Sequence, residues 1–109
     1  MTKKLFFKKP YLSQVLSGEK DLEGRVGYDN IRKINVNDTI LIQGTDPFYV
    51  RNLNMYASFQ EAVKENNYKR LIPDAKSVME AIKIYEDIYP VWKQKKLGVY
   101  IFEIKRFRN

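Results

Sequence analysis

The sequence predicts an α+β domain whose sheet is mostly antiparallel and curls into a small barrel. Many short segments rich in β-branched and aromatic residues are separated by turn clusters, a pattern typical of small barrels. Two capping-box patterns place helices between strands rather than in one-for-one alternation with them. The chain has 109 residues, of which 44% are hydrophobic, and it contains no repeat or linker. Residues 1–109 are therefore expected to form one domain.

The N-terminal half of the chain combines one short helix with four strands. Apolar residues recur at helical spacing after Pro10, and Gly18 is typical of a helix end, so a helix is predicted over residues 10–17. Segments of β-branched and aromatic residues bounded by turn residues predict the strands, which are expected at 3–8, 22–26, 39–43 and 48–56, the last with a bulge at Asn52 or Asn54.

The C-terminal half contains both capping boxes. Ser58-Phe59-Gln60-Glu61 predicts the start of one helix, and Ser77-Val78-Met79-Glu80 predicts the start of a longer helix that Pro90 ends. Gly98-Val99-Tyr100-Ile101-Phe102-Glu103-Ile104 predicts a final strand. The basic run from Lys93 to Lys96 is expected in a solvated loop, because such charge runs are usually exposed.

Composition narrows the classes of function. A net charge of +7 favours a polyanionic partner such as nucleic acid, with an ordinary basic surface as the alternative. The chain lacks Cys and His, which excludes disulfides and thiolate chemistry and removes the commonest metal ligand, so neither a metal nor a cofactor is expected. There is no long apolar run and no leader pattern, which predicts a cytoplasmic protein without a membrane partner. The sequence does not indicate an oligomeric state.

Residues 17–25 form the candidate functional segment, because they place strong cations, carboxylates and glycines in one turn and one half-strand. In an extended strand Asp21, Glu23 and Arg25 share a face, and Lys20 joins them only if the preceding turn rotates it. Glu23 and Arg25 would hold each other, while Lys20 and Arg25 would receive phosphate or carbonyl oxygens. The alternative is a surface hairpin whose charges are simply solvated.

The motif Gly18-x-Lys20-x-x-Glu23-x-Arg25 resembles that of the ASCH domains, the activating-signal-cointegrator homology group of the PUA-like β-barrels. Asn37 stands where the family usually has glycine. The resemblance implies a PUA-like barrel with a cleft between its wall and the inserted helices, and it implies binding of RNA, nucleotides or modified nucleosides. The other matching segments, in family order, are Ile34-Asn35-Val36-Asn37-Asp38-Thr39-Ile40, Tyr56-x-Ser58-Phe59, Asp87-Ile88-Tyr89-Pro90 and Gly98-x-Tyr100-x-Phe102-Glu103-Ile104.

The resemblance also implies an enzymatic alternative. One bacterial branch of the family hydrolyses acetylcytidine with a lysine, a threonine three residues later and a glutamate before the helix that ends in Ile-Tyr-Pro. Here Lys20, Glu23 and Asp74 occupy those places. A glutamate in place of the threonine would pair with Lys20 and keep it protonated, the wrong form for a general base. RNA or nucleotide binding by Lys20, Glu23 and Arg25 is therefore the first hypothesis. Hydrolysis of a modified nucleoside or of RNA, using Lys20, Glu23 and Asp74, is the second.

Two aromatic residues complete the set of candidate ligand-binding residues. Tyr89 and Trp92 lie near the end of the long helix beside Lys93, and aromatic rings next to cations are suited to stacking on unpaired bases. Packing in the core is the alternative, and it is the expectation for Tyr85 on the apolar face of the helix. Asp74 has the alternative role of starting that helix.

Overall fold

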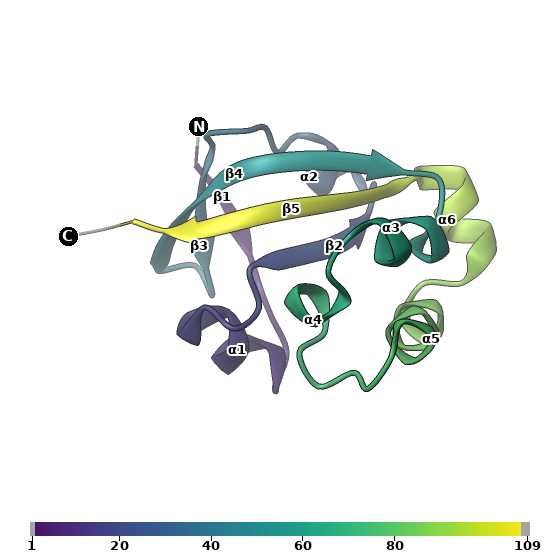
Figure 1. Ribbon diagram of the computed structural model, residues 1–109. Helices are drawn as coiled ribbons and strands as arrows, with labels where there is room; N and C mark the ends of the chain where they lie inside the picture. Colours follow the sequence, from purple (N-terminus) through teal and green to yellow (C-terminus); the bar gives the residue numbers. More distant parts are fainter. Residues whose placement is uncertain (1, 108–109) are drawn as a thin grey trace.

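The computed structural model describes residues 2–107, which contain five strands and six helices (Figure 1). In chain order the elements are β1 (Thr2–Leu5), α1 (Tyr11–Ser17), β2 (Leu22–Val26), α2 (Asp29–Arg32), β3 (Thr39–Ile42), β4 (Asp46–Tyr56), α3 (Phe59–Glu65), α4 (Tyr68–Leu71), α5 (Val78–Ile88), α6 (Val91–Leu97) and β5 (Val99–Arg106). None of these helices is long and apolar enough to cross a membrane.

The strands form one sheet in the order β1-β3-β4-β5-β2. Only β1 and β3 pair in parallel, so the mostly antiparallel sheet is confirmed. The register of β4 shifts between Val50 and Asn52, close to the expected bulge. Within residues 2–107 no ladder joins β1 to β2, so closure into a barrel is not confirmed. A side chain spans this gap instead, because Arg25 of β2 donates to the carbonyl oxygen of Phe6 at 2.9 Å.

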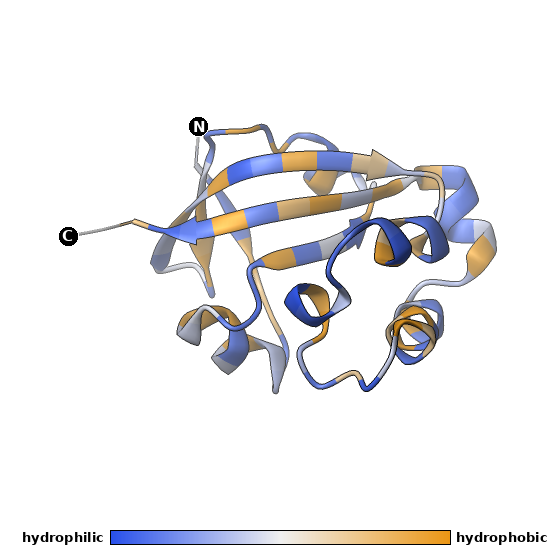
Figure 2. Ribbon diagram, in the orientation of Figure 1, coloured by the Kyte–Doolittle hydropathy of each residue, from blue (hydrophilic) through white to orange (hydrophobic). Residues whose placement is uncertain are grey.

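Strand β5 contributes to a hydrophobic cluster on each face of the sheet. Hydrophobic and hydrophilic residues alternate along β4 and β5 (Figure 2). On β5, Ile101 packs in a cluster with Phe59 and Tyr85, whereas the adjacent Phe102 packs in a second cluster with Phe7. Helices α3, α4 and α5 lie together on the side of the first cluster (Figure 1). Strand β2, at one end of the sheet, therefore borders the helical insert directly.

The predicted helix ends are confirmed by their hydrogen bonds. The backbone N–H groups of Glu61 and Glu80 donate to the hydroxyls of Ser58 and Ser77, each at 3.1 Å. Helix α1 ends at Gly18, whose φ of +87° lies in the left-handed region that glycine adopts without steric cost. This turn directly precedes the candidate functional segment.

Other local predictions were wrong. The first strand ends at Leu5 instead of continuing to residue 8, and Asp29–Arg32, which lie outside the predicted elements, form a short helix. The basic run at 93–96 lies in helix α6 instead of a loop. One residue within this run faces inward. The buried side chain of Gln94 accepts a hydrogen bond from the backbone N–H of Phe59 at 2.8 Å.

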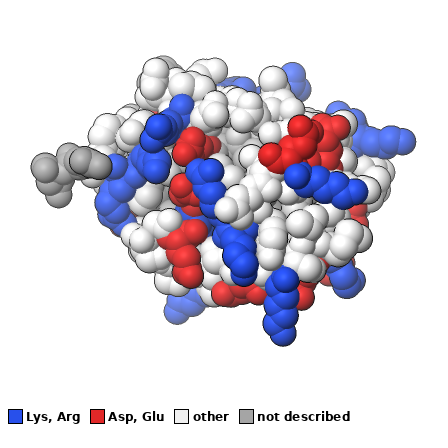
Figure 3. Space-filling model, viewed as in Figure 1, with Lys and Arg blue, Asp and Glu red and all other residues white. Residues whose placement is uncertain are grey.

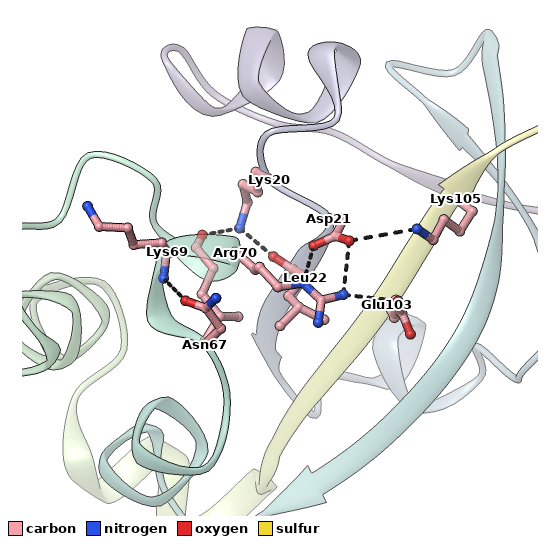
Figure 4. Close-up of polar contacts among 9 residues, drawn as sticks. Lys20, Asp21, Leu22, Asn67, Lys69, Arg70, Glu103 and Lys105 are labelled. Carbon is pink, nitrogen blue, oxygen red and sulfur yellow. Dashed lines mark hydrogen bonds and ion pairs between the residues drawn. The ribbon is translucent and has the colours of Figure 1, made fainter.

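Arg70 connects helix α4 to strand β5 and to the residue before β2 through ion pairs. Its guanidinium donates to both carboxylate oxygens of Asp21, at 2.7 and 2.9 Å, and to Glu103 at 3.0 Å. Figure 4 shows Asp21 directed toward β5, away from Lys20. The expectation that Asp21 shares a face with Glu23 is therefore wrong, because Asp21 precedes β2 and the alternation of the strand does not extend to it.

A turn before β3 holds a buried carboxylate. Asn37 adopts a φ of +74°, so it supplies the left-handed conformation of the family's usual glycine. Asp38 accepts from the backbone N–H of Asn35 at 2.8 Å and from the ammonium of Lys3 at 3.0 Å. The bond from Asn35 and then that from Lys3 lower the pKa of Asp38 to about 2, against the opposing effect of burial.

We predict that Asp38→Asn lowers the melting temperature at pH 7. The pKa of Asp38 is lower in the folded state than its ordinary value of 3.8, so its contribution to stability is complete above that value and is lost as the pH falls toward about 2. The difference between the variant and the original chain should therefore narrow below pH 4, as measured by thermal melts across pH. Asp46→Asn, in an exposed pair with Arg106, is the control and should change little. Equal melting temperatures for Asp38→Asn and the original chain at pH 7 would contradict the prediction.

Candidate functional site

Lys20 lies at the centre of the candidate site, and its side chain is only 2% exposed. Its ammonium donates to the carbonyl oxygen of Leu22 at 2.7 Å and to that of Leu71, and it pairs with Glu23 Oε1 at 3.0 Å. Figure 4 shows it directed toward α4 and the start of β2. An ammonium has three N–H donors, so all of them are engaged within the protein.

Glu23 is held between two cations. One carboxylate oxygen pairs with Lys20, and the other accepts a hydrogen bond from Arg25 Nε. Burial would raise the pKa of Glu23, but attraction to Lys20 and then to Arg25, together with their hydrogen bonds, outweighs burial and lowers the pKa below its ordinary value. Glu23 is therefore ionised at neutral pH.

Arg25 lies next to Glu23 on the same face of β2, as strand alternation predicts. Its guanidinium lies over the ring of Phe7, with the central carbon 5.2 Å from the ring centroid. Burial would lower the pKa of Arg25, but the charge of Glu23 more than offsets this effect and raises the pKa. The turn after α1 brings Lys20 to the same carboxylate, so the three charged residues of the motif form one cluster.

A pocket of about 320 Å³ opens beside this cluster. It lies where the two hydrophobic clusters meet at β2, because Phe7 belongs to one and Tyr85 to the other. The size is that of a small-molecule site. The charged cluster and Gly24 line one part of the pocket, and the remaining lining is largely aromatic: Phe6, Phe7, Tyr11, Tyr85 and Tyr89.

Tyr85 contributes a buried hydroxyl that has no hydrogen-bond partner among residues 2–107. The residue is 3% exposed, and its ring stacks on Phe59 with centroids 4.2 Å apart. An added Cβ at Gly24 would lie 3.1 Å from this hydroxyl and 2.9 Å from Phe59 Cε1, so the close approach requires glycine. Burial and then the charge of Glu23 raise the pKa of Tyr85 well above its ordinary value. The hydroxyl is therefore neutral at physiological pH.

The structure does not bring every candidate residue to the pocket. Tyr89 lines it with the charged cluster, whereas Trp92 lies outside the lining and is 61% exposed. Asp74 is also outside the lining, where its carboxylate accepts from the side-chain amide of Gln14 at 3.0 Å. Asp74 still acts electrostatically on one pocket residue, Tyr11. The pKa of Tyr11 is raised by burial, then by the charge of Glu23 and then by that of Asp74.

Sequence reasoning missed most of the pocket lining, including Tyr11, Gly24 and Tyr85. Tyr11 precedes the motif in α1. Tyr85 packs in the core, as its position on the apolar face of α5 predicts, and it also lines the pocket. Gly24 carried a usable signal, because a glycine inside a strand often marks close approach of another group. Among the described residues no cluster of His, Cys, Asp or Glu has the composition to hold a metal. On the face shown in Figure 3, acidic side chains lie among the basic ones instead of leaving a continuous basic groove.

We predict that Glu23→Gln destabilises the fold more than Arg25→Ala. Loss of the carboxylate leaves two cations without their counter-charge, one of them almost fully buried, and should reduce the free energy of unfolding by about 3–5 kcal/mol. Arg25→Ala leaves Glu23 paired with Lys20 and removes a partly exposed side chain, so its effect should be smaller. Denaturant titration measures both changes. Asp87→Asn, in the exposed pair with Lys83, is the control. A loss for Glu23→Gln no larger than that of the control would contradict a buried ion cluster.

Comparison with known proteins places this architecture among solved structures and in a family. A crystal structure of the hypothetical protein PH0355 aligns with a TM-score of 0.90 and 28% identity, covering 98% of this chain and 100% of that one. The solution NMR structure of protein PF0455 from Pyrococcus furiosus aligns with a TM-score of 0.82 and 27% identity, covering 100% of both chains. No curated protein gave a significant match. The family model for the ASCH domain matches residues 5–107, and the chain therefore belongs to the ASCH domain family.

Proposed function

We propose that this ASCH domain binds a nucleoside or nucleotide unit, free or within RNA, in the pocket beside β2. The observation that carries the proposal is the lining of the pocket, which combines aromatic rings with a fixed carboxylate, a guanidinium and an unpartnered hydroxyl. Unpaired bases are recognised by this combination of ring faces and hydrogen-bonding groups aimed at a base edge.

The hydrogen-bonding capacity left in the cluster defines a role for each residue. A carboxylate accepts at about four positions, and Glu23 uses its two oxygens toward Lys20 and Arg25, so it has capacity for an N–H group of a base. Arg25 uses Nε and one Nη2 bond, which leaves guanidinium donors for a phosphate or carbonyl oxygen. Lys20 has no donor left, so we assign it the role of holding Glu23.

Binding is better supported than the hydrolytic alternative. A general base needs a free lone pair, and the Lys20 nitrogen is surrounded by three acceptors that each require its protons. Asp74 is hydrogen-bonded to Gln14 outside the pocket lining. The three residues proposed for hydrolysis therefore do not converge on one reacting position.

We predict that common nucleosides and their 5′-monophosphates bind to the protein at low salt, and that the monophosphates bind less tightly as salt increases. Tyr85→Phe should weaken binding about twofold to tenfold, the equivalent of one lost hydrogen bond. It should not lower the melting temperature, because the hydroxyl has no partner in the free protein. Calorimetric titration measures the affinities.

The matched control for this experiment is Tyr49→Phe, which removes a hydroxyl outside the pocket lining and should leave binding unchanged. Absence of binding by every nucleoside and nucleotide tested at low salt would reject the proposed function. Equal affinities of the Tyr85→Phe variant and the original chain would reject the role of this hydroxyl.

We predict no turnover when the protein is incubated with acylated nucleosides or with labelled RNA. Chromatography of the products tests this, with Asp74→Asn and Lys20→Arg as comparison variants. Product formation that both substitutions abolish would replace the binding proposal with the hydrolytic one.

A further inference from the structure

We propose that a second nucleotide of single-stranded RNA, adjacent to the one in the pocket, binds on a surface platform formed by Tyr28, Trp92 and Lys93. This inference rests on the proposed function and deepens it, because it makes a strand of RNA, and not a free nucleoside, the fitting ligand. We call the three residues the α6 platform.

The α6 platform consists of two exposed rings around one ammonium. Tyr28 is 40% exposed and Trp92 is 61% exposed. Lys93 Nζ donates to the Tyr28 hydroxyl at 3.0 Å and lies 5.4 Å from the centroid of the Tyr28 ring and 5.5 Å from that of Trp92. The contacts with Lys93 hold the cation between the two rings, while the exposed ring surfaces face solvent.

Two residues of the α6 platform, Trp92 and Lys93, follow the pocket residue Tyr89 closely in the chain. Tyr89 lines the pocket. Burial raises its pKa against the opposing charge of Arg25, and Glu23 and then Tyr28 add to the increase. Ile88 also lines the pocket and, like Val91, is exposed. Exposed apolar side chains therefore lie at the junction of α5 and α6, between the pocket residues and the α6 platform in the chain.

The chemistry of the platform matches a nucleotide better than a protein segment. A base stacks on an aromatic face, and the adjacent phosphate needs a cation. Trp92 supplies a face and Lys93 supplies the cation. An apolar protein segment on the same surface would bury the Lys93 ammonium without a counter-charge, which is unfavourable.

The test compares a nucleoside 5′-monophosphate, which fills only the pocket, with a single-stranded RNA hexanucleotide. Trp92→Ala should weaken hexanucleotide binding about fivefold to one-hundredfold, the range for loss of one base–aromatic stack, and leave monophosphate binding unchanged. Trp92→Phe should retain most of the affinity because it keeps a ring, whereas Trp92→Leu should not. Melting temperatures should not change, because the side chain is exposed.

Salt dependence tests the cation. Lys93→Gln should reduce the slope of log affinity against log salt for the hexanucleotide by roughly 0.7, the value for one phosphate contact on a single strand. Lys83→Gln is the matched control, because Lys83 lies two residues from Tyr85 on α5 and so faces the opposite side of the helix, where it is exposed. This control should leave the slope unchanged.

The outcomes separate the platform from the pocket. Equal hexanucleotide affinities of Trp92→Ala and the original chain overturn the α6 platform, and so does full rescue by Trp92→Leu, which indicates an apolar partner. If the monophosphate does not bind while Trp92→Ala weakens the hexanucleotide, the platform stands and the pocket assignment fails. If Tyr85→Phe weakens both probes and Trp92→Ala weakens neither, the pocket stands and the platform fails.

Discussion

The buried ammonium of Lys20 is the constraint on which the site depends. Its acceptors come from the start of β2, the end of α4 and the carboxylate of Glu23. A charge this deeply buried is tolerated only when all its donors are matched, because an unpaired ion in the interior carries a large desolvation cost. Movement of α4 away from β2 would break one of these matches. The same ion therefore fixes the position of the helical insert and the orientation of the carboxylate that faces the pocket.

Helix α4 needs such constraints, since a helix of four residues has almost no stability of its own. The buried ammonium of Lys20 donates to the carbonyl oxygen of Leu71 at the C-terminal end of α4. Arg70 of the same helix donates to Asp21 and Glu103 nearer the surface (Figure 4). Consecutive residues in the chain, Lys20 and Asp21, thus bind opposite sides of one short helix.

The parts of the site that sequence could predict are those close together in the chain. Alternation places Glu23 and Arg25 on one face of the strand, and the turn at Gly18 brings Lys20 to them. The aromatic wall could not be predicted in this way, because Tyr11 and Tyr85 reach the pocket only after two helices pack against β2. For the sheet, short strands correctly indicate a mostly antiparallel arrangement, but closure into a barrel depends on how the two edge strands meet. Likewise, the lysines of α6 suggest an exposed loop. The inward packing of Gln94, which is typical of one face of a helix, is not evident from the sequence.

The unpartnered hydroxyl of Tyr85 separates a recognition site from a purely structural ion cluster. A buried polar group without a partner reduces the stability of the free protein by about 1–3 kcal/mol, and replacing the hydroxyl by hydrogen would remove that cost. The surrounding groups make the position specific, because Gly24 admits the hydroxyl, Phe59 holds its ring and Glu23 keeps it protonated. A bound base that hydrogen-bonds to this oxygen recovers the lost free energy on binding. Stability and the proposed recognition therefore make opposite demands at Tyr85.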